Sequence, residues 1–479
     1  MIIQIILFIF AIAIVFLTAV KPKLSYYAMI FFASWYSLFI DVGLEINIHR
    51  FIIIAFLFFL PLCLFSKKNT IKIPPTFKYL IIFIFYALTI TLIAQFYSPK
   101  SYIETFTRGE GRWIFQLIIL LIYATPTLLP LLFLRKIEDI KTAATVFIGS
   151  TLILSIIGWI QSLAYYFYGI FLFPYPGKGL LGDEPKAILI DFFGKTFYRM
   201  HSLGGEPKYF ATTLAAAIIL LIISKIVYRK GFRFEYFLIG FFLISIFMSF
   251  STSGIAIFIV GLGLLTSLAF FIKGLRFKFI FKSIFIISVI LLISFTLLVI
   301  SRVVSFEEVG SILLERTLER SPIESYDEAT LKFLSNNPIY SLFGVGMGNI
   351  HLYARDYLPD WATTLPSYNA PFAPNSGYLI VGELGIFGLT LFLLAYLMPV
   401  WFNFKYVRYI SDYNFRCTIL TINFFAIFIL ISYLLRESLV IFVYIILGLL
   451  YFLNQEIRVI LKRQVEKPNL RLYPNALKK

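Results

Sequence analysis

Residues 209–227 read YFATTLAAAIILLIISKIV, an uncharged and largely apolar run up to Lys225. A helix needs about 20 predominantly apolar residues to cross a bilayer, and this stretch meets that requirement. About 13 stretches do so, which predicts an all-α polytopic integral membrane protein with about 13 transmembrane helices (12–14), forming a single membrane domain over residues 1–479. The predicted spans are 2–20, 25–40, 51–65, 77–97, 113–134, 143–171, 209–227, 236–250, 254–271, 279–300, 376–400, 417–434 and 438–455.

The composition excludes a large water-soluble domain. Of the 479 residues, 60% are hydrophobic and 14% are charged, whereas soluble proteins carry about 25% charged residues. The two cysteines, Cys63 and Cys417, lie far apart in apolar stretches, so neither a disulfide framework nor a cysteine metal cluster is expected. Residues 2–20 have no basic n-region and no small-residue cleavage site, so we expect a retained first helix rather than a signal peptide.

The basic residues indicate the orientation of the chain. One alternate set of connections, together with the C-terminal tail, holds 27 of the 42 Lys and Arg residues and 6 of the 25 Asp and Glu residues. Cytoplasmic loops carry such an excess, so we expect this side in the cytoplasm and the N-terminus outside. Anionic lipid explains the net charge of +17, and no nucleic-acid partner is expected.

Two connections on the predicted outer side are too long for simple turns. They are residues 172–208 and the larger loop 301–373, which we expect to be helical, while the inner connections are short and basic. Long loops are usually functional, so we expect the active surface to face outward, into the periplasm of a cell with two membranes. We find no internal repeat, Walker loop, dinucleotide fingerprint or zinc signature, and we expect no cofactor, no metal and no ATP-driven pump.

The first outer loop ends in RMHSLGGEPKYF, residues 199–210, and the span 209–227 follows. Gly204 and Gly205 allow a tight backbone, and Pro207 suits the first turn of a helix. A helix N-terminus with Arg199, His201 and Lys208 nearby is a natural anion site. An interfacial anchor with a helix cap is the alternative.

The second outer loop carries paired arginines. If residues 307–320 are helical, Arg316 and Arg320 lie on one face, one turn apart. The alternative is a surface ladder in which Glu315 and Glu319 neutralise them. The sequence SPIE at 321–324 has the pattern of a capping box, so a second helix is expected to run to about Ser335. A glycine-rich turn, FGVGMGN, follows at residues 343–349.

The sequence PNSGYL, residues 374–379, leads into the eleventh predicted span. Glu383 lies in apolar surroundings about two turns into it, where a carboxylate is costly and functional by default. A hydrogen-bonded structural glutamate is the alternative. Earlier in the chain, STSG at 251–254 connects two spans and reads either as a motif or as a simple turn.

Taken in order, these segments resemble the bacterial O-antigen polymerase and ligase superfamily over roughly residues 195–390. The matching pieces are Arg199 with Gly204 and Glu206-Pro207, residues 251–254, Arg316 or Arg320 before Asn337-Pro338, residues 343–348, and Asn375, Tyr378, Leu379 and 383–388. The resemblance implies a glycosyltransferase of the bacterial inner membrane that uses undecaprenyl-diphosphate-linked glycans as donor and acceptor. Its active site would face the periplasm, and no nucleotide sugar would be needed. Besides membrane lipids, a chain-length regulator protein is a further expected partner.

The resemblance also implies roles for individual residues. Arg199 and Arg320, with Arg316 as substitute and Lys208 nearby, would bind the donor diphosphate, because fixed guanidinium groups stabilise its developing charge. Glu206, His201 and His351 are the candidate bases for the acceptor hydroxyl. Asn375, Tyr378 and Glu383 would support the site.

One difference from the family pattern distinguishes the ligase branch from the polymerase branch. Ligases of this superfamily carry a histidine immediately before the asparagine of the late motif, whereas this chain has Pro374. We therefore favour a polymerase over a ligase that transfers glycan to lipid A-core. The competing class is a non-enzymatic flippase or transporter of lipid-linked glycans. Transporters commonly show repeated halves and mid-membrane charges, whereas this sequence has no detectable repeat and its ionisable residues gather in the outer loops.

Overall fold

The computed structural model describes residues 2–41, 45–66, 73–97, 112–172, 189–192, 195–228, 234–271, 325–359, 374–435 and 439–466. Within these ranges the chain is mostly helical, with two short antiparallel hairpins. Seven helices of the described residues are long and apolar enough to cross a membrane, which agrees with an all-α membrane protein. They are Pro75–Ala94, Arg112–Phe133, Ile137–Tyr168, Pro207–Tyr228, Ser376–Tyr409, Tyr413–Leu435 and Val440–Arg463.

The predicted count of about 13 spans was wrong for the part of the chain that the structure describes. The predicted spans 51–65, 236–250 and 254–271 coincide with shorter apolar helices. The predicted span 25–40 overlaps a helix of only 11 residues, Pro22–Phe32, which is followed by a strand at Phe39–Asp41. Hydropathy counts such stretches because it registers apolar composition, which a short buried helix satisfies as well as a spanning one. The predicted span 279–300 lies outside the described residues.

The elements follow one another along the chain as the structure has them. They are α1 Ile2–Val20, α2 Pro22–Phe32, β1 Phe39–Asp41, β2 Glu45–Asn47, α3 Ile48–Ser66, η1 Pro75–Phe77, α4 Lys78–Ala94, α5 Arg112–Ala124, η2 Thr125–Thr127, α6 Leu129–Phe133, α7 Ile137–Tyr168, β3 Leu189–Phe192, β4 Lys195–Tyr198, α9 Pro207–Tyr228, α10 Glu235–Met248, α11 Thr252–Phe271, α14 Ser325–Asn336, α15 Pro338–Phe343, α16 Ile350–Tyr353, η3 Arg355–Tyr357, α18 Ser376–Tyr406, η5 Val407–Tyr409, α19 Tyr413–Leu435 and α20 Val440–Glu466.

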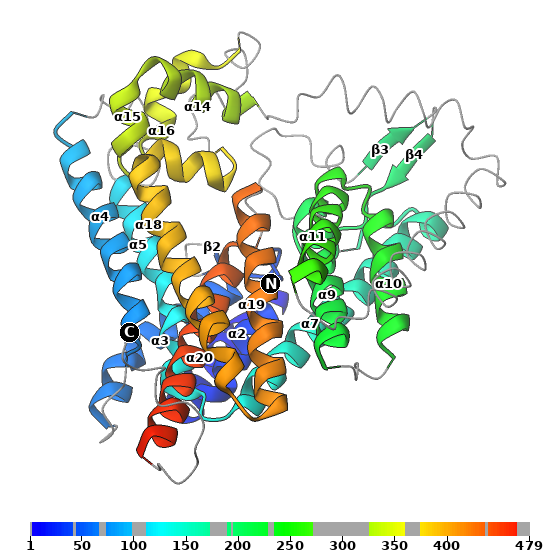
Figure 1. Ribbon diagram of the computed structural model, residues 1–479. Helices are drawn as coiled ribbons and strands as arrows, with labels where there is room; N and C mark the ends of the chain where they lie inside the picture. Colours follow the sequence, from blue (N-terminus) through cyan, green and yellow to red (C-terminus); the bar gives the residue numbers. More distant parts are fainter. Residues whose placement is uncertain are drawn as a thin grey trace.

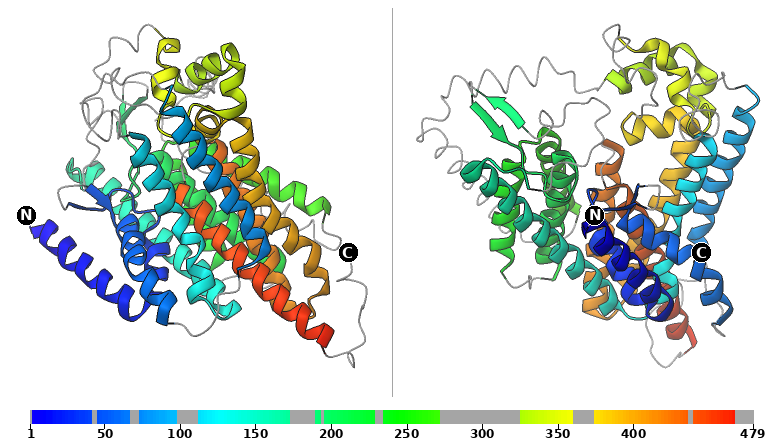
Figure 2. Two further views of the ribbon diagram at one scale, coloured as in Figure 1. Left: turned by 90° about the vertical axis from the view of Figure 1, so that its left-hand side faces the viewer. Right: turned by 180° about the vertical axis from the view of Figure 1, so that it is seen from behind.

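The helices form two neighbouring groups (Figures 1 and 2). One group contains α9, α10 and α11 with part of α7, and the other contains α4, α5, α18 and α20, while α19 packs against both α9 and α18. Helices α14, α15 and α16 lie over one end of α4 and α18, and the hairpin β3–β4 lies toward the same end of the molecule. The C-terminal end of α20 lies at the opposite end.

Helix α9, which contains the apolar run 209–227, is the core of its group. Every residue from Phe210 to Ser224 is buried, and α9 packs against α7, α10, α11 and α19. A helix that is apolar on all sides is stable only where neighbours cover it completely. Small residues allow close packing: Gly254 of α11 approaches the Cβ of Ala211 so closely that an added Cβ would overlap it.

In the second helix group, a tyrosine hydroxyl donates to a backbone carbonyl that a proline leaves without a donor, and asparagine side chains connect the helices. Pro399 lies inside α18 and has no N–H to donate to the carbonyl of Ala395. The Tyr451 hydroxyl of α20 donates to that carbonyl instead, at 3.2 Å. Nearby, Asn454 donates to the Asn403 side chain at 2.7 Å, and Asn403 donates to Asn423 at 2.9 Å. This satisfied amide chain connects α18, α19 and α20 within the apolar bundle.

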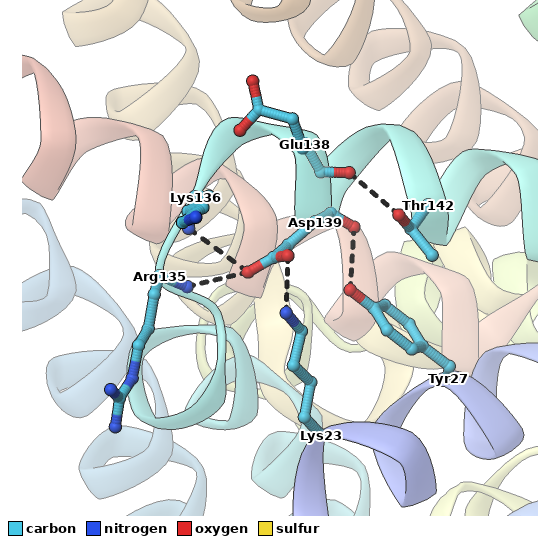
Figure 3. Close-up of polar contacts among 7 residues, drawn as sticks. All are labelled: Lys23, Tyr27, Arg135, Lys136, Glu138, Asp139 and Thr142. Carbon is cyan, nitrogen blue, oxygen red and sulfur yellow. Dashed lines mark hydrogen bonds and ion pairs between the residues drawn. The ribbon is translucent and has the colours of Figure 1, made fainter.

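Asp139 connects two elements at the end of the molecule that we predict to be cytoplasmic (Figure 3). One carboxylate oxygen accepts the Lys23 ammonium at 2.6 Å, and the other accepts the backbone N–H groups of Arg135 and Lys136 at 2.9 and 3.2 Å. The Tyr27 hydroxyl donates to the Asp139 carbonyl at 3.3 Å. The ion pair with Lys23 therefore links the connections around Lys23 and Arg135, which the sequence assigns to the same side of the membrane. The two backbone hydrogen bonds cap the start of α7.

Candidate functional site

The loop from Arg199 to Glu206 connects β4 to α9 and is fixed on the neighbouring helices. The Met200 amide donates to the Met248 carbonyl of α10 at 2.9 Å, and the Ser202 hydroxyl donates to the Leu154 carbonyl of α7 at 2.6 Å. Gly205 has a φ of 85°, a conformation that favours glycine. Pro207 is the first residue of α9, as predicted. The loop is therefore a defined turn at a helix N-terminus.

His201 is buried beneath this loop. Its side chain is 1% exposed, and its Nε2 lies 3.1 Å from the Tyr198 hydroxyl. Burial lowers the pKa of His201 to about 4, and the nearby positive charge of Arg199 acts in the same direction. The imidazole is therefore neutral at pH 7, and it contacts Tyr198, which was not among the predicted site residues.

Glu206 and Lys208 form an ion pair at the surface of the same loop. Lys208 Nζ lies 2.9 Å from Glu206 Oε2, with side chains 35% and 38% exposed, and it also lies 5.0 Å from the centroid of the Tyr209 ring. Glu206, a candidate base, and Lys208, a candidate diphosphate-binding residue, therefore neutralise each other's charge. Arg199 is half-buried in the same loop.

A second cluster forms where α14 to α16 meet α18, and it contains His351. The expected helix ending near Ser335 is confirmed as α14, which ends at Asn336. The turn 344–348 that follows α15 has three glycines with φ between 81° and 83°. Its Val345 and Gly346 amides donate to the Gly382 and Glu383 carbonyls of α18, at 3.1 and 2.8 Å.

These carbonyls are available because α18 is broken. Gly385 has φ 70° and ψ −178°, so the helix is interrupted there. A Cβ at Gly385 would overlap the Leu342 carbonyl oxygen, and one at Gly344 would overlap that of Glu383. Two glycines that are far apart in sequence therefore permit one close backbone contact. The glycine-rich turn supplies the amide donors that the broken helix lacks.

Glu383 holds the end of this turn. Its side chain is 6% exposed, and its Oε1 accepts the Gly348 N–H at 2.7 Å. Gly348 in turn packs against Arg112, at the start of α5: an added Cβ would lie 3.2 Å from Arg112 Cγ. Glu383 is therefore a buried, hydrogen-bonded carboxylate. This geometry agrees with a structural glutamate, the alternative to a functional one.

His351 is also buried, with 5% exposure. Burial lowers its pKa to about 3, and the positive charges of Arg112 and Arg355 add to this effect. His351 is therefore neutral at pH 7 and lies in a positive environment, which suits an anionic neighbour. Arg112 was not predicted from the sequence, although an arginine at the outer end of a predicted span was a usable signal.

Asn375 is the N-cap residue of α18 and is held by Asp327 of α14. Its backbone N–H donates to Asp327 Oδ1 at 2.7 Å, and its Nδ2 donates to Oδ2 at 2.5 Å. Asp327 is 1% exposed and was not predicted, because 48 residues separate the two positions. Tyr378 is half-buried in the first turns of α18.

The structure thus gathers the predicted residues into two clusters. Arg199, His201, Glu206 and Lys208 lie at the start of α9, whereas His351, Glu383 and Asn375 lie around α16 and α18. Both clusters lie toward the same end of the molecule, over different helix groups (Figure 1). Arg316 and Arg320 lie outside the described residues. Within the described ranges, no group of three or more His, Cys, Asp or Glu residues could hold a metal ion.

The described helices fit an all-α membrane protein with two polar clusters toward one end. No protein-family model matches the chain, and no curated protein matches it either.

Proposed function

We propose that this protein is a membrane glycosyltransferase that polymerises undecaprenyl-diphosphate-linked oligosaccharide repeat units at the outer face of the bacterial inner membrane. The observation that carries the proposal is the contact between the turn 344–348 and the break in α18. Two segments that resemble the O-antigen polymerase and ligase superfamily meet there through three backbone amides and the Glu383 carboxylate. The arginine-bearing loop 199–206 lies toward the same end of the molecule.

The proposed reaction uses positive charge rather than a redox or nucleotide cofactor. A hydroxyl oxygen of the acceptor glycan attacks the anomeric carbon of the donor, and the bond between that carbon and the diphosphate oxygen breaks. Undecaprenyl diphosphate leaves with the bonding electrons, and a base takes the proton of the hydroxyl. Arg199 stabilises the charge on the departing diphosphate, and Arg316 and Arg320 are proposed to act with it.

The base is proposed among His351, Glu206 and His201, and their surroundings differ. A base must reach the acceptor hydroxyl directly or through one water. His201 is covered by the loop and contacts Tyr198, whereas Glu206 is partly exposed but paired with Lys208. His351 is neutral and lies beside two arginines. Burial and the two arginines oppose protonation of His351 as well, so we keep all three residues as candidate bases.

The test is to supply purified protein with undecaprenyl-diphosphate repeat units alone. We expect release of undecaprenyl diphosphate and a ladder of longer lipid-linked glycans, without ATP or nucleotide sugar. A single transfer that occurs only when lipid A-core is added would indicate a ligase. Translocation of the lipid without a new glycosidic bond would indicate a flippase, and the enzyme proposal would be wrong.

A further inference from the structure

Arg50, in the first turn of α3, is fixed by a tyrosine of α5. Its Nε and Nη2 both donate to the Tyr123 hydroxyl, at 2.9 and 2.6 Å. Its Cζ also lies 5.4 Å from the centroid of the Tyr123 ring. That ring stacks on Tyr444 of α20, with centroids 6.0 Å apart and planes at 7°. Stacking on Tyr444 fixes the Tyr123 ring, and the Tyr123 hydroxyl in turn fixes the orientation of the Arg50 guanidinium.

This arginine lies beside the interior of the helix bundle. Tyr123 is near the midpoint of the 22-residue span Arg112–Phe133, and the residues that follow Arg50 are apolar from Phe51 to Leu60. A charged side chain that packs against an apolar bundle is costly, and it commonly marks the path of a substrate or ion. Charged side chains within a membrane protein commonly pair with one another or with backbone carbonyls.

Arg50 has a neutral partner instead. In the part of the chain that the structure describes, the acceptor for its guanidinium is the Tyr123 phenol, and Arg50 forms no ion pair. An arginine has five N–H donors, and two of its nitrogens are engaged here. The side chain is half-buried rather than enclosed. It therefore keeps donors for a further, negatively charged acceptor that can reach it.

Arg50 is also connected to the loop at the start of α9. The ring of His49, its neighbour in α3, packs edge-on against Tyr36 with centroids 5.7 Å apart. Tyr36 packs against Tyr209 at 5.2 Å, and the Ser37 amide donates to the Leu203 carbonyl at 3.0 Å. Tyr36 and Ser37 therefore connect the start of α3 to the loop that carries Arg199 and to the first turn of α9.

We propose that Arg50 is a further anion-binding residue of this protein and binds a phosphate group of a polyprenyl diphosphate. The assignment of that lipid rests on the proposed function, whereas the phosphate chemistry rests on the guanidinium. A guanidinium can hold two phosphate oxygens at once. Tyr123 is a positioning residue, because it orients the guanidinium and does not itself contact the anion.

The experiment measures binding to the purified full-length protein in detergent by native mass spectrometry. The probe is farnesyl diphosphate, which carries the isoprenyl diphosphate without glycan; inorganic pyrophosphate and phosphatidylglycerol are the comparison ligands. We expect Arg50→Gln to weaken farnesyl diphosphate binding about tenfold or more. Arg50→Lys, which keeps the charge, should bind at an intermediate level, and Tyr123→Phe should lose several-fold through a less ordered guanidinium.

Arg408 provides a matched control. It makes the same kind of contact, with Nη2 2.8 Å from the Tyr409 hydroxyl and Cζ 4.8 Å from the ring centroid. It lies, however, in a connection predicted to be cytoplasmic. Arg408→Gln should leave binding of farnesyl diphosphate unchanged.

Three results would overturn the inference. One is equal binding of farnesyl diphosphate by wild type and by folded Arg50→Gln or Arg50→Lys. Another is a loss of farnesyl diphosphate binding in Arg408→Gln equal to that in Arg50→Gln. The third is that substitution of Arg50 weakens the binding of phosphatidylglycerol alone. A parallel loss for pyrophosphate would support recognition of phosphate. Because no glycosyl transfer is measured, the inference and the polymerisation proposal can fail independently.

Discussion

The Glu383 carboxylate accepts a hydrogen bond of 2.7 Å from the backbone N–H of Gly348, which lies 35 residues earlier in the chain. It is one of several hydrogen bonds between the glycine-rich turn and the broken helix α18. The Val345 and Gly346 amides also donate to α18. His351 follows three residues after Gly348. The position of this candidate base relative to α18 therefore depends on how well the turn is held.

The first prediction concerns this hydrogen bond. Glu383→Leu should lower the free energy of unfolding by about 1–3 kcal/mol, because it leaves a buried N–H without an acceptor. Glu383→Gln keeps a carbonyl oxygen for Gly348 and should cost less. Thermal unfolding of the purified variants in detergent measures the difference. Equal losses in the two variants would mean that the hydrogen bond does not hold the turn.

The second prediction concerns the break in α18. Gly385→Ala should destabilise the protein by about 1–3 kcal/mol or more, since its φ of 70° with ψ of −178° is nearly exclusive to glycine. A Cβ there would also overlap the Leu342 carbonyl. Gly149→Ala in α7 is the control, because a Cβ at this position would meet nothing within 4 Å, and alanine favours a helix. If Gly385→Ala unfolds no more readily than Gly149→Ala, the break is absent.

The third prediction is a pH dependence of stability. The pKa of His201 is lowered to about 4 and that of His351 to about 3, whereas an unfolded histidine titrates near 6.5. Between these values the unfolded chain binds more protons than the folded one, so stability should fall as the pH drops below about 6.5. The fall is at most about 1.4 kcal/mol per pH unit for each histidine. His201→Asn should flatten this slope, measured by unfolding between pH 7 and 4; an unchanged slope would exclude a buried neutral His201.

Parts of this architecture could be predicted from local sequence. Pro207 marked the start of α9, and the capping-box pattern at 321–324, which lies outside the described residues, indicated the helix that ends at Asn336. The break at Gly385 could not be predicted, because a glycine inside an apolar run leaves the hydropathy of the run unchanged. Its partner, the Leu342 carbonyl, belongs to another segment of the chain.

The candidate site was predictable only residue by residue. Arg199, His201 and Lys208 stood out because polar residues cluster before an apolar helix, and in the structure all three lie at or just before the start of α9. Their pairing was not visible: the Glu206–Lys208 ion pair and the contact of His201 with Tyr198 depend on the turn of the backbone. Asp327 and Arg50 were missed because their partners are distant in sequence.

The fourth prediction tests the orientation of the chain. In a background without Cys63 and Cys417, Ser335→Cys should react with an impermeant maleimide added to spheroplasts, because this exposed position of α14 belongs to the predicted outer loop. Asn414→Cys, exposed at the start of α19, should react only after permeabilisation. The reverse pattern would place both candidate clusters on the cytoplasmic side.

The fifth prediction is the most direct test of the central claim. Proteoliposomes with the loop 199–206 facing outward should convert externally added undecaprenyl-diphosphate repeat units into a ladder of longer lipid-linked glycans. Arg199→Ala should reduce the ladder by about 100-fold or more while the protein remains folded, and Arg199→Lys should be partly active because it lacks the guanidinium fork. The account would be contradicted by a wild-type protein that forms no ladder. An undiminished ladder in both Arg199→Ala and the double variant Arg316→Ala/Arg320→Ala would contradict the proposed diphosphate site.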